Sequence, residues 1–184
     1  MSELQEFASR DEAELQAAFP PDPNSPTRTA LRKAFRDCFL MLISAVDGSP
    51  SSQLTPQNVL QVFKELKALT GWVCDATSKD DWKRLRTLTA DKLSKDDWTY
   101  SAITDLLKAA NIGKRGHPVT DARDLAIKAY DLRLKSPPTS WPKITKQLCR
   151  CGQHEHTLKC QERIRIAALE LGKLLKGWGI VVVH

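Results

Sequence analysis

The chain has 184 residues, of which 41% are hydrophobic and 27% charged, with 8 Gly and 10 Pro. This length and composition are typical of one globular domain or two small ones, and they exclude a collagen-like or wholly disordered chain. The longest apolar run, residues 39–43, is far shorter than the roughly 18 residues of a membrane-spanning helix. Because the N-terminus is acidic and polar, we expect no secretory signal and a cytoplasmic, nucleoid-associated or nuclear location.

The positive charge lies in the C-terminal part of the chain. Residues 1–110 contain 14 basic and 16 acidic side chains, a net charge of −2, whereas residues 111–184 contain 14 and 6, a net charge of +8. Basic side chains gain affinity for a polyanion by releasing its condensed counterions. The asymmetry therefore favours a nucleic acid over a membrane as the partner, and a merely solubilising basic surface is the alternative.

Helical periodicity predicts a bundle over residues 1–112. The first predicted helix covers residues 2–19 and stops at the prolines of residues 20–23. Ser25-Pro26 and Thr55-Pro56 are start signals, and each is followed by apolar residues at helical spacing. The segment Ser-Lys-Asp-Asp-Trp occurs at 78–82 and again at 94–98, which indicates two further helix starts. We expect this bundle to mediate homodimerisation or to bind a protein partner.

A basic linker over residues 113–119 is expected to separate this bundle from a basic three-helix unit over residues 120–184. Thr120 is the predicted cap of its first helix, and Ser140 that of a short second helix ending at Leu148. The third helix is expected from Leu158 to Lys176, with Gly177 as its C-terminal cap. A brief strand is predicted at 180–183; because one strand cannot stand alone, this tail must pair with another segment, pack as coil or meet a second copy of the chain. The predicted fold class is all-α.

Two of the predicted helices have sequences that bear on the class of domain. They are residues 126–133, Ala-Ile-Lys-Ala-Tyr-Asp-Leu-Arg, and residues 140–148, Ser-Trp-Pro-Lys-Ile-Thr-Lys-Gln-Leu. Over residues 118–184, three short helices on a basic segment resemble helix-turn-helix DNA-binding domains. The resemblance implies that the helix after the turn enters the major groove. Here that helix offers Lys159, Gln161, Arg163 and Arg165. Arginine pairs in bidentate fashion with guanine, and glutamine with adenine.

The turn departs from this pattern, because about ten residues replace the usual three or four. An alternative contact set is therefore Lys143 and Lys146 on the preceding helix, with the last helix as scaffold. A basic three-helix bundle that binds another protein is the further alternative.

The linker contributes two more cations, Lys114 and Arg115. The segment Arg115-Gly116-His117-Pro118 resembles the Arg-Gly-Arg-Pro core of minor-groove AT-hooks, with His in place of the second Arg. The resemblance implies an arm that enters an A·T-rich minor groove, and a simple tether is the alternative.

A cluster of cysteines and histidines lies between the last two predicted helices. Within 12 residues stand Cys149, Cys151, His154, His156 and Cys160. Zinc binds four tetrahedral N or S ligands, so three cysteines and one histidine can hold a structural zinc that fixes the entry of the last helix. The spacing C-x-C-x2-H-x-H-x3-C matches no common zinc finger. Reduced thiols without metal, or a disulfide, are the alternatives.

Together these patterns predict a regulatory protein that binds duplex DNA through its C-terminal unit. DNA is favoured over RNA as the target. RNA stays an alternative, because attraction to phosphate does not by itself separate the two nucleic acids. The alternative is an adaptor whose basic surface binds an acidic protein. We expect no enzyme activity and assign no catalytic residue, since no phosphate loop or carboxylate constellation is recognisable. A nucleic-acid enzyme that uses the cysteine and histidine cluster is a third alternative.

Overall fold

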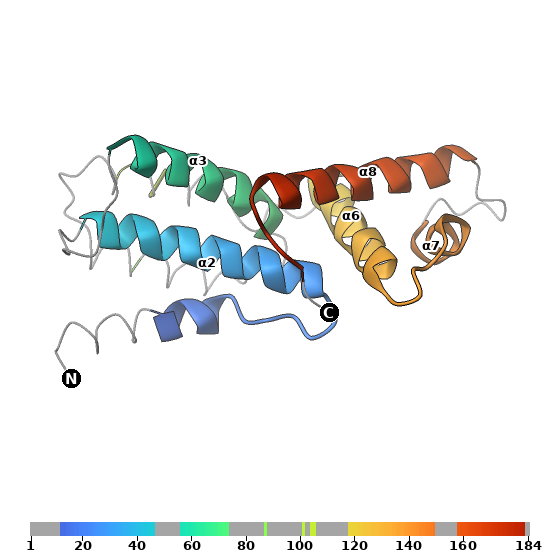
Figure 1. Cartoon of the computed structure of the whole chain (residues 1–184), viewed down its shortest axis with the longest axis horizontal. Helices are drawn as coiled ribbons and strands as arrows, with labels where there is room; N and C mark the ends of the chain where they lie inside the picture. The colour runs from blue at the N-terminus through green and yellow to red at the C-terminus, as the bar shows by residue number, and fades with distance from the viewer. Residues whose placement is uncertain are drawn as a thin grey trace. The chain divides into compact units, whose positions relative to one another are not determined.

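The computed structural model describes residues 12–46, 56–73, 118–149 and 158–182, and the single positions Thr87, Ser101, Thr104 and Asp105. Within these residues the regular elements are helices and none is a strand, which confirms the all-α fold class. They are α2 (Pro26–Val46), α3 (Pro56–Val73), α6 (Pro118–Leu134), α7 (Trp141–Leu148) and α8 (Leu158–Gly177) (Figure 1). A short helical stretch at 12–18 precedes α2. No helix of the described part combines the length and apolarity needed to cross a bilayer.

The chain divides into two compact units. The first combines Met1–Pro21 with Leu31–Lys114, and the second combines Asp22–Ala30 with Arg115–His184. The start of α2 therefore groups with the C-terminal helices, and the rest of α2 groups with the N-terminal residues. The repeated segments at 78–82 and 94–98 and most of the predicted linker lie outside the described residues.

The core of the first unit is built around the apolar stripe of α2. Leu31, Phe35, Phe39 and Leu42 recur every three or four residues, and each is completely buried, as the helical spacing predicts. The ring of Phe19 lies 4.8 Å, centroid to centroid, from that of Phe35. Burying each of these side chains contributes roughly 1.5–3 kcal/mol, so the stripe attaches the 12–18 helix firmly to α2.

Two arginines of α2 satisfy carbonyl groups beyond the end of the 12–18 helix. Arg32 donates to the carbonyl of Pro20 at 2.6 Å, and Arg36 donates to that of Phe19. The last carbonyls of a helix have no partner within it, so such donors complete its C-terminal end.

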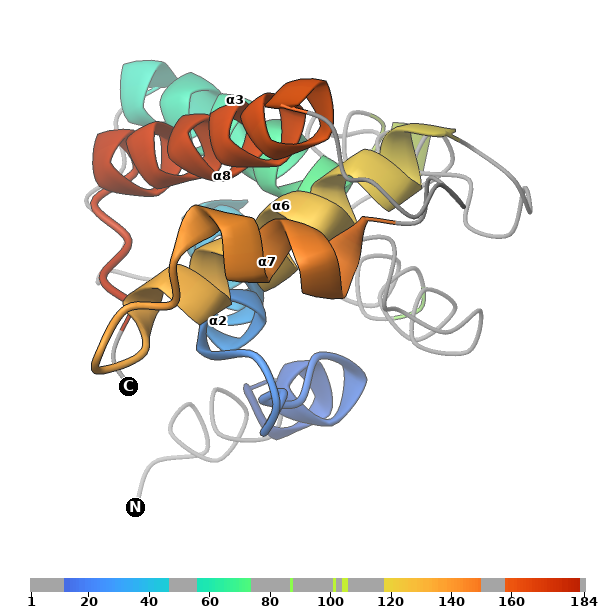
Figure 2. The ribbon, with the colours of Figure 1, turned by 90° about the vertical axis from the view of Figure 1, so that its right-hand side faces the viewer.

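The second unit contains α6, α7 and α8, which pack against one another (Figure 2). Its core cluster consists of Ala129, Ile144, Ile164 and Ala168, contributed by all three helices. Further along α8, a Cβ atom at Gly172 would lie 2.9 Å from the ring of Tyr130 in α6. Because a real Cβ is essentially never found that close to another heavy atom, any larger residue at 172 requires the Tyr130 ring to shift.

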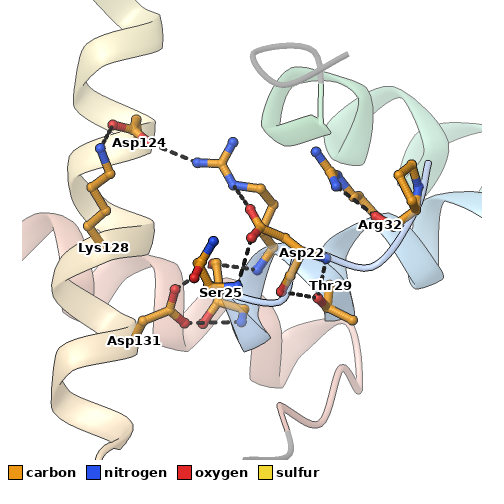
Figure 3. Close-up of polar contacts among 11 residues, drawn as sticks. Asp22, Ser25, Thr29, Arg32, Asp124, Lys128 and Asp131 are labelled. Atoms are coloured by element: carbon orange, nitrogen blue, oxygen red, sulfur yellow. Dashed lines mark hydrogen bonds and ion pairs between the residues drawn. The ribbon is translucent and has the colours of Figure 1, made fainter. Parts of the chain in front are cut away.

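A polar cluster joins residues 22–30 to α6, and we call it the α2 clamp (Figure 3). Its centre is Asp131, which is 8% exposed and accepts hydrogen bonds from the hydroxyl of Ser25 and, at 3.0 Å, from the backbone N–H of Thr27. Ser25 Oγ in turn accepts from the N–H of Arg28 at 3.1 Å, as an N-cap side chain does. Asp131 therefore supplies a buried anion at the positive end of α2, from 104 residues away.

The clamp also contains a bridged arginine. Arg28 lies 3.4 Å from the carboxylate of Asp22 and 2.7 Å from that of Asp124. The other oxygen of Asp124 accepts from Lys128, four residues along α6, at 2.8 Å. Thr29 closes the loop before α2, because its hydroxyl accepts from the N–H of Asp22 at 2.8 Å and donates to the carbonyl of the same residue at 3.0 Å. These contacts explain why residues 22–30 group with the C-terminal helices.

The start of α6 differs from the prediction. The helix begins at Pro118, two residues before Thr120, so Thr120 lies inside the first turn and does not cap it. Proline is favoured in the first turn because its fixed φ suits a helix and its missing N–H has no partner there.

The end of α8 differs as well. Gly177 was predicted as the C-terminal cap, but the left-handed glycine that ends the helix is Gly179, with φ of +66°. The N–H of Gly179 donates to the carbonyl of Lys176 at 3.1 Å, and that of Ile180 donates to the carbonyl of Leu175 at 2.9 Å, which is a Schellman motif. The predicted strand at 180–183 is wrong over its described residues 180–182, which have no regular structure. A strand without a partner leaves its backbone groups unpaired and is not stable.

Candidate nucleic-acid interface

Helix α7 presents a basic outward face. Its eight residues, Trp-Pro-Lys-Ile-Thr-Lys-Gln-Leu, contain no acid. Ile144 and Thr145 are buried, whereas Lys143, Lys146 and Gln147 are exposed. Residues three apart share a side of a helix, so the two lysines lie together on the outward face. In Figure 2 α7 lies in front of α6.

Local contacts hold α7 at both ends. The carbonyl of Ser140 accepts from the N–H of Ile144 at 3.0 Å, which places Ser140 at the N-cap as predicted, although its side chain makes no capping hydrogen bond. The guanidinium carbon of Arg133 lies 5.1 Å from the ring centroid of Trp141, and the same side chain donates to the carbonyl of Thr139 at 3.0 Å. Arg133 therefore connects the end of α6 to the start of α7 through a cation–π contact.

The four residues predicted to read DNA from the last helix all lie near the start of α8. Lys159, Arg163 and Arg165 are exposed, and Gln161 is partly buried. Lys159 and Arg163 line one shallow groove, together with Glu162 and Glu170. Arg165 lies 3.7 Å from Glu162.

These four residues do not share one face of α8. Each residue advances the helix by about 100°, so Arg163 and Arg165 point about 200° apart. Lys159 lies with Arg163, four residues on, and Gln161 lies with Arg165 for the same reason. The sequence already indicates this alternation between two sides of the helix, because the four residues stand at every second position. Only one pair at a time can therefore face a groove of DNA.

The outward faces of α7 and α8 differ in charge, and the difference bears on which of them attracts phosphate. The outward face of α8 carries Glu162 and Glu170 among its cations. The lysines of α7 have no acid in their own helix. In α6, Asp131 is buried and its carboxylate accepts hydrogen bonds from the start of α2. The outward face of α7 therefore carries two lysines and no acid of its own helix, whereas that of α8 carries both signs.

The two described members of the predicted zinc cluster lie at one cavity. Cys149 ends α7 and Cys160 lies in the first turn of α8, and both line a cavity of about 440 Å³ at the junction of the three helices. Cys151, His154 and His156 lie outside the described residues, as do Lys114 and Arg115. Among the described residues no three histidines, cysteines or carboxylates come together as metal ligands.

The comparisons with known proteins give no relative. No protein-family model matches the sequence, and neither does any curated protein or solved structure. The functional assignment therefore depends on the chemistry of these helices.

Proposed function

We propose that this chain is a regulatory protein that binds duplex DNA, with Lys143 and Lys146 of α7 as its main phosphate contacts. The proposal is carried by one observation: an exposed lysine pair on an acid-free helix, within a segment of net charge +8. Contacts to phosphate supply most of the affinity of such proteins and fix their orientation on the duplex. This set is the alternative that the long turn before the last helix left open.

The dimensions of α7 fit this role. An α-helix is about 10–12 Å across with its side chains, and the major groove of B-DNA, about 12 Å wide, admits it. Gln147, exposed next to Lys146, provides an amide that can pair with the edge of adenine. The packing of Ile144 into the core cluster holds these side chains in a fixed orientation.

Salt-dependent fluorescence anisotropy with a labelled mixed-sequence duplex tests the proposal. The logarithm of the association constant falls by about 0.9 per phosphate contact for each tenfold rise in salt. We therefore expect Lys143→Ala, Lys146→Ala to reduce the salt slope by about 1.8. If counterion release supplies the whole contribution of each contact, binding at 0.1 M salt becomes about 60-fold weaker.

The matched control is Lys64→Ala, Lys67→Ala on α3. These two lysines are also exposed and also three residues apart, but they belong to the first unit. The control removes the same net charge and should leave the salt slope unchanged. Equal losses in the two double variants would show that net charge alone drives binding, and absence of binding at low salt would refute the proposal. If the chain binds an acidic protein and duplex DNA does not displace that protein, the adaptor is favoured.

A structural zinc is the second part of the proposal. It is supported by Cys149 and Cys160, which line one cavity from two helices and can supply two of the four ligands. We expect about one zinc per chain in protein purified without chelator, and loss of that zinc in Cys149→Ser, Cys160→Ser. Cys38→Ser is the control, because Cys38 is buried in α2 of the first unit. Metal analysis that finds no zinc in the unaltered protein, or the same zinc in the double variant, would remove this part.

A further inference from the structure

One side of α8 is buried through Ile164, Ala168, Leu171 and Leu175, and the opposite side of the helix is exposed. A shallow groove on it is lined by Lys159, Glu162, Arg163, Ile166, Ala167 and Glu170, all of α8. Three apolar side chains on this helix, Ile166, Leu169 and Leu174, are 45%, 48% and 40% exposed. Single exposed apolar residues are ordinary, but Ile166 lies at the centre of this side with Leu169 and Leu174 on its two flanks, and an apolar centre of this kind indicates a contact surface.

The charges on this face are arranged symmetrically about its centre. Arg163 and Glu170 lie on either side of Ile166 and Ala167, at equal distances along the sequence. Seven residues separate them, which is about 10 Å along the helix and too far for an ion pair within one chain. Arg163 and Glu170 are therefore placed to meet opposite charges on another molecule.

A second copy of the same helix supplies those charges. In two antiparallel α8 helices related by a two-fold axis between Ile166 and Ala167, each Arg163 lies opposite Glu170 of the other copy. A two-fold interface repeats every contact, so this ion pair forms twice. Glu162 falls near Lys173 of the other copy in the same register, and the small side chain of Ala167 lets the helices approach at the centre.

We propose that this face of α8 pairs with the same face of a second copy of the chain in an antiparallel homodimer. A second copy fits the face better than a nucleic acid does, because Glu162 and Glu170 repel phosphate. Two helices of about 30 Å bury less than the roughly 1,200–2,000 Å² of a standard stable interface. We therefore expect a weak dimer with a dissociation constant on the order of 10–100 µM, independent of DNA binding.

Sedimentation equilibrium of the full chain, across this concentration range, measures the dimer. Arg163→Glu and Glu170→Arg each replace two attractive pairs by two repulsive ones and should weaken dimerisation by about 30-fold. The double variant Arg163→Glu, Glu170→Arg restores opposite charges across the two-fold axis and should recover most of the affinity. The control is Lys67→Glu, an exposed charge reversal on α3 in the first unit.

Recovery in the double variant is specific to contact between two copies, because the two positions are too far apart to pair within one. Circular dichroism establishes that each variant keeps its helices. If Arg163→Glu loses its helices, Glu170→Arg alone retains the test. A monomer at every concentration, a dimer that both single reversals leave intact, or a double variant that stays monomeric would each overturn the proposal.

Discussion

Removing the carboxylate of Asp131 should release the α2 clamp. Asp131 accepts two hydrogen bonds, from the Ser25 hydroxyl and the Thr27 N–H, in a site where it is 8% exposed. A hydrogen bond to a charged group contributes about 1.5–3 kcal/mol, and a carboxylate at a helix N-terminus adds about 0.3–1 kcal/mol. Ser25 Oγ still accepts from the N–H of Arg28 when Asp131 is removed, so this capping hydrogen bond of α2 is kept and the loss is limited to the two bonds to Asp131. We expect Asp131→Ala to lower the free energy of unfolding by about 3–4 kcal/mol.

Two further variants separate the parts of this effect. Asp131→Asn keeps one carbonyl oxygen for the Thr27 N–H and should cost about 1–2 kcal/mol. Ser25→Ala combined with Asp131→Ala should cost less than the two single changes together, because they remove the same hydrogen bond. The control Asp37→Ala removes an exposed carboxylate that pairs with Lys33 at 2.6 Å, and should cost about 0.5 kcal/mol or less.

Urea unfolding followed by circular dichroism measures these free energies. Amide hydrogen exchange measures the clamp locally, since the Thr27 N–H loses its acceptor in Asp131→Ala and should exchange faster. An Asp131→Ala protein within about 0.5 kcal/mol of the unaltered chain, or strict additivity with Ser25→Ala, would show that Asp131 does not act through these two hydrogen bonds.

Two further predictions concern a glycine of α8 and a cysteine of α2. Gly172→Ala places a Cβ 2.9 Å from the Tyr130 ring and should lower the free energy of unfolding, measured by thermal unfolding, by about 1–3 kcal/mol. The control Gly177→Ala meets no atom within 4 Å and should be neutral or stabilising. Equal effects of the two changes would contradict the close approach of α6 and α8. Burial raises the pKa of the Cys38 thiol from 9.0 to about 11, with Glu65 and Asp37 adding to the shift. The folded chain therefore keeps a proton that the unfolded chain loses, so stability is unaffected below pH 9 and falls by up to about 2.7 kcal/mol as pH rises towards 11. Urea titrations at several pH values should show this loss, and a Cys38→Ala protein with the same alkaline loss would assign it to other groups.

The helices were predictable because their signals are local. The apolar stripe predicted for the last helix, Ile164, Ala168, Leu171, Leu175 and Trp178, has the three- and four-residue spacing of one helix face. The first four side chains are buried, and Trp178, just beyond the end of α8, is partly buried. The bounds of α7 follow from an N-cap residue and a proline at its start. The exact ends were less predictable, because Gly177 and Gly179 are both glycines and only the backbone hydrogen bonds distinguish the one that must be left-handed.

The α2 clamp was not predictable in the same way. Ser25 carries an N-cap signal whether or not a second acceptor is present, and nothing near Thr27 in the sequence points to Asp131, 104 residues away. The only available signal was an aspartate within an otherwise apolar turn of α6, which sequence reasoning could as well place in solvent. Tertiary contacts between polar groups have no periodicity, so helical spacing does not predict them.

The division of charge between α7 and α8 follows from helix length. An eight-residue helix has few outward positions, and in α7 two of them are lysines, so its surface has a single sign. A helix of 20 residues such as α8 has many more, and Arg163 and Glu170 alternate in sign along it. A surface of one sign attracts a polyanion of any sequence, whereas an alternating one is complementary only to a partner with the reverse order. That difference is why we propose phosphate as the partner of α7 and a second copy of the chain as the partner of α8.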